Sequence, residues 1–190
     1  MTMSTHLPTR AFGKTGMQIT RLGIGAWAMG GNMWGPQDDA ESVAAIRHAI
    51  DLGINWIDTA AVYGNGHSET VIGQALRQMP ADRRPFVFTK GGIVRDSEGK
   101  NPRRIGEAKH LRGELEGSLK RLGLEVIDLY QMHWPSDDVG LEDYWGTLLE
   151  LKKEGKVRHV GLSNHNVDQL RRAEAMGHVE TLQPPFSMIK

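Results

Sequence analysis

The chain has 190 residues, of which 39% are hydrophobic and 24% are charged, a composition typical of one soluble globular domain. Its 23 lysine and arginine residues balance its 23 aspartate and glutamate residues, so the net charge favours neither nucleic acid nor an anionic membrane. It contains no cysteine, which excludes disulfides, thiolate metal sites and a thiol nucleophile.

The N-terminal segment, MTMSTHLPTR, lacks the apolar core of a signal peptide, and no apolar run has the length of a membrane span. We therefore expect a cytoplasmic protein with no membrane or nucleic-acid partner. The segment that follows, RAFGKTGMQIT, predicts a short β-hairpin that turns at residues 14–16.

From residue 21 onward, short apolar runs alternate with segments of helical periodicity. The runs that predict strands are RLGIGAWAMG, INWID, PFVFTK, VIDLYQMH, KVRHVGLSN and HVETLQPPF. The segments that predict helices are DDAESVAAIRHAIDLG, SETVIGQALRQM, HLRGELEGSLKRLG, LEDYWGTLLELKKEG and VDQLRRAEAMG. Repeats of this kind, roughly thirty residues long, indicate parallel strands joined by helical crossovers.

Two parallel architectures fit this alternation. A doubly wound sheet needs a glycine-rich phosphate turn after its first strand, but after Gly23 and Gly25 the third glycine of GxGxxG is replaced by Ala28. In a (β/α)8 barrel, polar residues from the carboxyl ends of several strands share one rim. Four such ends carry polar residues, which favours the barrel: Asp58, Lys90, His133 and the pair Ser163–Asn164.

A full barrel has eight strands and about 250 residues. The sequence therefore predicts an α/β chain with an N-terminal β-hairpin and about the first six βα units of a (β/α)8 TIM barrel. We expect residues 1–190 to form a single domain that is truncated at its C-terminus.

The polar residues at the strand ends suggest a proton-donating site. Tyr63 follows Asp58 by five residues, and a phenol with an ordinary pKa of about 10 holds a proton at neutral pH. We expect Lys90 to lower that pKa, with Asp58 as its counter-ion and His133 as hydrogen-bond donor to a substrate oxygen. Without a nucleophile or a metal cluster, such a site suits hydride addition to a carbonyl, the hydride coming from a cofactor.

Each of these residues also has an ordinary structural alternative. Asp58 could form an Asx turn, Tyr63 could pack beside a turn, and Lys90 could be a solvated loop residue. His133 could be a core histidine, and Ser163–Asn164 could cap a helix. Their shared placement at successive strand ends is the argument for a site.

The sequence resembles the aldo-keto reductases over almost its whole length. The matching segments are GIGAWAMGG, GINWIDTAAVYGNGHSE, FVFTK, LYQMHWP, EGKVRHVGLSN and LQPPFS, and they are most similar to the bacterial and potassium-channel β-subunit-like branch. The resemblance implies a TIM barrel, NADP(H) as cofactor, a small carbonyl compound as substrate, and a catalytic tetrad of Asp58, Tyr63, Lys90 and His133, with Tyr63 as general acid.

The resemblance also implies the remaining site residues. Those expected at the cofactor are Gly25, Ala26, Trp27, Asp58, Ser163, Asn164 and Gln183, of which the last three suit the nicotinamide carboxamide. Aromatic walls for the substrate are expected from Trp27, Trp34 and Trp134. No metal site is expected, and the resemblance sets no oligomeric state.

Three other functions remain open on the sequence alone. The chain could be a non-catalytic NADP-binding regulatory subunit, like the channel β subunits, or an inactive truncated reductase. It could also be a barrel enzyme that forms a Schiff base on Lys90, such as an aldolase, although such an enzyme has no need of Asp58 and Tyr63 at their spacing.

Overall fold

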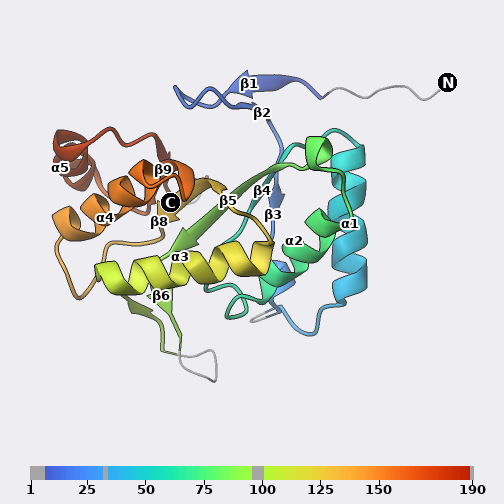
Figure 1. Cartoon of the computed structure of the whole chain (residues 1–190), viewed down its shortest axis with the longest axis horizontal. Coiled ribbons are helices and arrows are strands. Elements are labelled where there is room, and N and C mark those ends of the chain that lie inside the picture. The colour runs from blue at the N-terminus through green and yellow to red at the C-terminus, as the bar shows by residue number, and fades with distance from the viewer. Residues whose placement is uncertain (1–6, 32–33, 96–100, 189–190) are drawn as a thin grey trace.

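A twisted parallel sheet with helices along one face forms the body of the computed structural model (Figure 1). The structure describes residues 7–31, 34–95 and 101–188. The N-terminal residues 1–6, where we expect no signal peptide, lie outside this range. Within the described residues no helix is long and apolar enough to cross a membrane.

The main sheet has six strands in the order β10-β9-β8-β5-β4-β3, and every pair in it is parallel. In chain order the strands are β3 (Ile24–Gly25), β4 (Trp56–Asp58), β5 (Phe86–Gly91), β8 (Ile127–Met132), β9 (Val157–Ser163) and β10 (Thr181–Gln183). Neighbouring strands in the sheet are consecutive in the chain, apart from the small ribbon between β5 and β8. This is the order of the first six strands of a TIM barrel and confirms the predicted fold class.

In the described part of the chain, five α-helices connect these strands: α1 (Asp39–Asp51), α2 (His67–Arg77), α3 (Ala108–Leu122), α4 (Leu141–Lys153) and α5 (Val167–Met176). They begin and end largely where the sequence predicts. Asp38 caps α1 by accepting from the backbone N–H of Glu41, and Gly123 ends α3 in the left-handed region, with φ of 69°. The cap of α5 is Asn166, so Ser163 and Asn164 remain available for another role.

The two faces of the sheet carry different cores. On the helix side, the leucine stripe of α3 and apolar residues of the other helices pack against alternate strand residues such as Ile57, Val87 and Tyr130. On the opposite face, Phe88 and Leu129 form a smaller core. Because successive strand residues point to opposite faces, this division fixes which side chains face the interior of the barrel.

The N-terminal hairpin covers the interior face near the amino-terminal ends of the strands. It consists of β1 (Thr9–Ala11) and β2 (Gln18–Thr20), paired antiparallel as predicted. Phe12 stacks on Phe88 at 5.6 Å between ring centroids, and Trp56 stacks on Phe88 from β4 at 5.4 Å. In Figure 1 the hairpin lies along the top, at the end of the sheet opposite to the β6–β7 ribbon.

The sequence pattern did not predict four short elements. A two-stranded antiparallel ribbon, β6 (Ile93–Val94) with β7 (Arg103–Arg104), projects beyond the end of β5 (Figure 1). The 3-10 helices η1 (Ala28–Gly30) and η2 (Ala81–Arg83) lie in the connections after β3 and before β5. Elements of two or three residues are too short to show a hydrophobic period.

Candidate active site

The polar residues at the strand ends share one face of the sheet. Along each strand they stand an even number of residues from a side chain of the interior core: Asp58 from Trp56, Lys90 from Phe88, and His133 from Leu129. Ser163 and Gln183 are register partners on β9 and β10. The parity of the strands therefore brings the predicted residues to the same rim of the barrel.

Lys90 and Asp58 form a close ion pair at this rim. The Lys90 ammonium lies 2.8 and 2.7 Å from the two carboxylate oxygens of Asp58 and donates to the carbonyl oxygen of Thr59 at 2.9 Å. The Lys90 side chain is 2% exposed. Burial lowers the pKa of Lys90, and the charge and hydrogen bonds of Asp58 oppose that shift. Asp58 is thus a counter-ion to Lys90, as predicted.

The hydrogen bonds of Lys90 argue against the Schiff-base alternative. A Schiff base requires a neutral amine that can reach a carbonyl. Here the ammonium is buried and donates to Asp58 and Thr59. This arrangement disfavours Lys90 as a nucleophile.

The loop after β4 places Tyr63 beside this pair. Its start is held by the Ala61 N–H, which donates to the carbonyl oxygen of Lys90 at 3.0 Å. Further along, Gly64 packs directly on Gly30: a Cβ at Gly64 would overlap the Gly30 carbonyl oxygen. Since Gly64 also has φ of 62°, glycine is required there, and its backbone contact sets the position of Tyr63.

Tyr63 lies between Lys90 and His133. The Lys90 ammonium is 5.5 Å from the centroid of the Tyr63 ring, and the His133 ring meets it edge-on at 5.7 Å between centroids. The rings of Tyr63 and His133 and the Lys90–Asp58 pair are therefore neighbours at this rim.

The predicted effect of Lys90 on the pKa of Tyr63 is wrong. The pKa of Tyr63 is raised above its ordinary value of 10.0, first by burial and second by the charge of Asp58. The physical reason is the ion pair itself. Because both carboxylate oxygens of Asp58 lie within 2.8 Å of the Lys90 ammonium, the carboxylate opposes the field of the cation at the phenol, and desolvation decides the direction.

His133 is a neutral imidazole in this site. Burial, with the charges of Lys90 and Arg95 adding to it, lowers the pKa of His133 to about 3. Its Nδ1 is buried and has no hydrogen-bond partner among the described residues. A neutral imidazole has one N–H donor, which is what the predicted contact with a substrate oxygen requires.

Ser163, Asn164 and Gln183 meet at the ends of β9 and β10. The Asn164 amide nitrogen donates to the carbonyl oxygen of His133 and to the Ser163 hydroxyl, both at 3.0 Å. The Ser163 hydroxyl donates to the carbonyl oxygen of Gln183 at 3.0 Å. Gln183 reaches back to Asp58, with 3.5 Å between its amide nitrogen and a carboxylate oxygen. The three residues predicted at the carboxamide are thus joined to one another and to the ion pair.

A cavity of about 250 Å³ opens beside Tyr63 and His133. Trp27 and Trp134, two of the three tryptophans expected at the substrate, line it. Trp34 lies outside the lining and packs edge-on against Trp27, with ring centroids 5.5 Å apart. Trp34 therefore contacts the cavity only through Trp27.

Gly25, Ala26 and Trp27 form the segment at the end of β3. Gly25 is in register with Asp58, and the Ala26 N–H donates to the carbonyl oxygen of Asp58 at 2.9 Å. From the helix side, Ser68 donates to the carbonyl oxygen of Ala26 at 2.8 Å. The segment that carries Trp27 is therefore fixed to the strand that carries Asp58.

Sequence reasoning missed the contribution of the β6–β7 ribbon. Ile93 and Arg95 line the cavity, and the Arg104 guanidinium lies 4.6 Å from the centroid of the Trp134 ring. A cation over an indole face is attractive and orients the ring. Arg104 and Trp134 are far apart in the sequence, and no sequence pattern predicts that they are in contact.

Comparison with known proteins identifies the family of this chain. The model of the aldo/keto reductase family matches residues 21–190. The chain belongs to the aldo-keto reductase family. It is 38% identical to aldo-keto reductase YhdN of Bacillus subtilis over 178 residues, which cover 93% of this chain and 53% of that protein.

Two further comparisons extend the family relationship. The chain is 35% identical to the NADH-specific methylglyoxal reductase of Escherichia coli over 190 residues, covering 93% of this chain and 58% of that reductase. It superimposes on the glycerol dehydrogenase AKR11B4 from Gluconobacter oxydans with a TM-score of 0.86 at 37% identity, covering 96% of this chain and 56% of the dehydrogenase. This aldo-keto reductase chain thus spans a little over half the length of the relatives it matches.

Proposed function

We propose that residues 1–190 belong to a single NADP-dependent oxidoreductase domain whose site transfers a hydride between NADPH and an aldehyde or ketone. The observation that carries the proposal is that Tyr63 and His133 line one cavity, while the buried Lys90–Asp58 pair places its ammonium 5.5 Å from the centroid of the Tyr63 ring. These groups suit the protonation of an oxygen that gains negative charge, the event that accompanies hydride addition to a carbonyl.

Tyr63 is the proton donor in this proposal. Its raised pKa keeps the hydroxyl protonated throughout the neutral range, so Tyr63 carries a proton to donate at every pH in that range. In reduction the Tyr63 O–H bond breaks as the proton passes to the carbonyl oxygen, and in oxidation the proton returns to the phenolate. A positioned acid of this kind accelerates a reaction by about 10²- to 10⁴-fold.

His133 orients the substrate oxygen. Because the lowered pKa of His133 keeps its imidazole neutral, the ring donates one hydrogen bond without placing a second cation beside Lys90. Tyr63 and His133 line the same cavity, with their ring centroids 5.7 Å apart. The substrate oxygen would therefore receive a hydrogen bond from each.

The Lys90–Asp58 pair organises the site electrostatically. It places an ammonium beside the Tyr63 ring, where negative charge develops when the proton leaves. The counter-charge on Asp58 holds the ammonium at that point in a buried setting. The pair is thus a fixed dipole and supplies no proton itself.

The residues at the ends of β9 and β10 fit a nicotinamide cofactor. A carboxamide needs both a donor and an acceptor. Both hydrogens of the Asn164 amide are used within the protein, so its oxygen is presented as an acceptor, and Ser163 and Gln183 add hydroxyl and amide groups. Gly25, Ala26, Trp27 and Asp58 would border the ring. The cofactor, when bound, supplies the hydride.

The choice of NADPH over NADH comes from the family resemblance. The Escherichia coli relative, whose name states NADH specificity, makes this choice a matter for measurement. The cavity of about 250 Å³ between Trp27 and Trp134 fits a small carbonyl compound with an apolar or aromatic portion.

One experiment tests the function. The purified chain is mixed with NADPH or NADH and a panel of small aldehydes and ketones, and absorbance at the nicotinamide band is followed. We expect oxidation of NADPH that depends on the carbonyl compound and is lost in Tyr63→Phe. Cofactor binding by fluorescence without turnover would instead favour the regulatory subunit, and absence of both would favour an inactive truncated reductase.

A further inference from the structure

A single peptide group at the end of β5 is held from two sides. The carbonyl oxygen of Gly91 accepts from the backbone N–H of His133 at 3.0 Å. The N–H of Gly92, which belongs to the same peptide, donates to the Glu114 carboxylate at 2.6 Å. Hydrogen bonds on the two ends of one amide polarise each other and strengthen together.

This peptide joins three parts of the site. Lys90 directly precedes it, and the carbonyl oxygen of Lys90 accepts from the Ala61 N–H at the start of the Tyr63 loop. His133, which directly follows β8, lies across from it. The orientation of the Gly91–Gly92 peptide therefore affects where β5 and β8 end.

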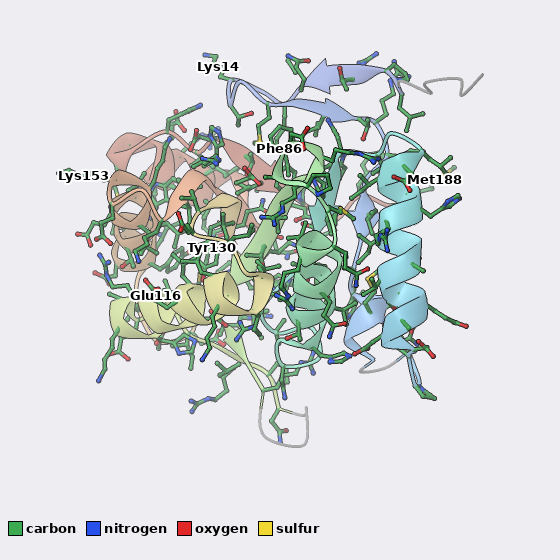
Figure 2. The ribbon with its side chains drawn as sticks, turned by 45° about the vertical axis from the view of Figure 1, so that its right-hand side comes forward. Lys14, Phe86, Glu116, Tyr130, Lys153 and Met188 are labelled. Carbon is green, nitrogen blue, oxygen red and sulfur yellow. The ribbon has the colours of Figure 1, made fainter. Side chains whose placement is uncertain are left out.

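The environment leaves Glu114 little freedom. Its side chain is 10% exposed on the inner face of α3. A Cβ at Gly91 would overlap the Tyr130 hydroxyl and lie 2.5 Å from Glu114, so only glycine lets the carboxylate approach this peptide. Figure 2 marks Tyr130 on β8 and Glu116 on α3, two residues along from Glu114.

We propose that Glu114 is a positioning residue that holds the Gly91–Gly92 peptide and, through it, the strand ends that carry Lys90 and His133. The inference rests on the proposed function for the roles of Lys90 and His133. The hydrogen bonds that transmit the effect are independent of that function.

Charged and titratable groups surround Glu114 on every side. From α3 come His110, 3.8 Å from the carboxylate, and Arg121; from α2 comes the buried Glu69, and from β8 comes Tyr130. A second cavity, of about 810 Å³, borders Glu114, and its lining includes Arg95, Glu107 and Lys109. Burial, reinforced by Glu69, raises the pKa of Glu114 to about 7, while the Gly92 N–H and Arg121 oppose the shift. The carboxyl group therefore changes charge near neutral pH, and its hydrogen bond to Gly92 strengthens on ionisation.

Nuclear magnetic resonance of the chain labelled with ¹⁵N-glycine and ¹⁵N-histidine tests the proposal without any turnover. The backbone amides of Gly92 and His133 are followed from pH 5.5 to 8.5 in the wild type, Glu114→Gln and the control Glu116→Gln. Glu116 is exposed on the same helix and pairs with Lys156. We expect both amides to shift through a transition near pH 7 in the wild type and the control, and to lose it in Glu114→Gln, which keeps an oxygen acceptor but cannot ionise.

The proposal is overturned if the Gly92 transition persists in Glu114→Gln, or if His133 shows no transition while Gly92 does.

Steady-state kinetics provide a second test. Glu114→Ala should lower kcat by about 10- to 100-fold with KM little changed, since misplacing catalytic groups by about 1 Å costs about 100-fold. Glu114→Gln should restore most of kcat and flatten its pH dependence between 6 and 8. A wild-type chain without turnover would contradict the proposed function, and the amide shifts would still decide the role of Glu114.

Discussion

The Lys90 ammonium contacts both carboxylate oxygens of Asp58, at 2.8 and 2.7 Å. The two residues are 32 positions apart in the chain and lie on neighbouring strands of the sheet. Solvent has little access to this contact, because the Lys90 side chain is 2% exposed and that of Asp58 is 17% exposed. A pair of this kind is costly to bury and more costly to break.

Removing one member of this pair should therefore destabilise the protein more than removing both. We expect Lys90→Met to lower the free energy of unfolding by about 3 kcal/mol, because Asp58 is left without its counter-ion. The double variant Lys90→Met/Asp58→Asn should recover a large part of that loss. Urea unfolding of the wild type, both single variants and the double variant measures the coupling. Additive losses in the double variant would contradict a coupled pair.

Tyr63→Phe should separate chemistry from binding. The substitution removes only the hydroxyl, so kcat should fall at least about 100-fold, the usual contribution of a positioned general acid. The Kd for NADPH should stay within about twofold of the wild-type value, because the ring still packs against Trp27 at 6.1 Å between centroids. Fluorescence titration and turnover assays measure the two effects. An equal loss of cofactor affinity would mean that Tyr63 acts through packing.

His133 should remain uncharged across the neutral range. Its pKa is lowered to about 3 by burial first, so its imidazole signals should not titrate between pH 5 and 8 in a ¹H–¹⁵N spectrum, where His133→Gln identifies them by their loss. The same shift affects stability. Below pH 6.5 the unfolded chain binds the proton and the folded protein does not, so the wild type should lose stability relative to His133→Gln as pH falls, by at most about 1.4 kcal/mol per pH unit. A transition near pH 6.5 would show that the site is hydrated and the imidazole accessible.

The sequence was sufficient to predict the strand order and the rim. Asp58, Lys90 and His133 end strands whose apolar runs are unambiguous, and parallel strands must present those ends on one side. The stripe of leucines in α3 was equally clear, and those leucines are buried. These features depend on local periodicity, which a single sequence contains.

What the sequence could not show depends on contacts between distant residues. Ser68 and Glu69 were expected as the opening of a helix, yet Ser68 bonds to Thr59 and Ala26, and Glu69 is fully buried against Arg121 and Thr89. The raised pKa of Tyr63 follows first from its burial and second from the charge of Asp58, and the sequence has no pattern that shows either effect. The same is true of Glu114, which looks like an ordinary acidic residue of an amphipathic helix.

The approach of Gly64 to Gly30 provides the last prediction. Alanine at Gly64 must adopt φ of 62° and overlap the Gly30 carbonyl oxygen, whereas alanine at Gly16 must adopt φ of 80° with no atom within 4 Å. Gly16→Ala should therefore cost only the backbone strain, about 1 kcal/mol, and Gly64→Ala should cost about 1–3 kcal/mol more because the backbones must separate.

The separation would move Tyr63, which directly precedes Gly64, so Gly64→Ala should also reduce kcat while Gly16→Ala leaves it unchanged. Urea unfolding and turnover assays of the two variants measure both effects. Equal destabilisation by the two substitutions would show that the loop after β4 yields without strain. In that case the backbone contact between Gly30 and Gly64 would not be what positions the phenol.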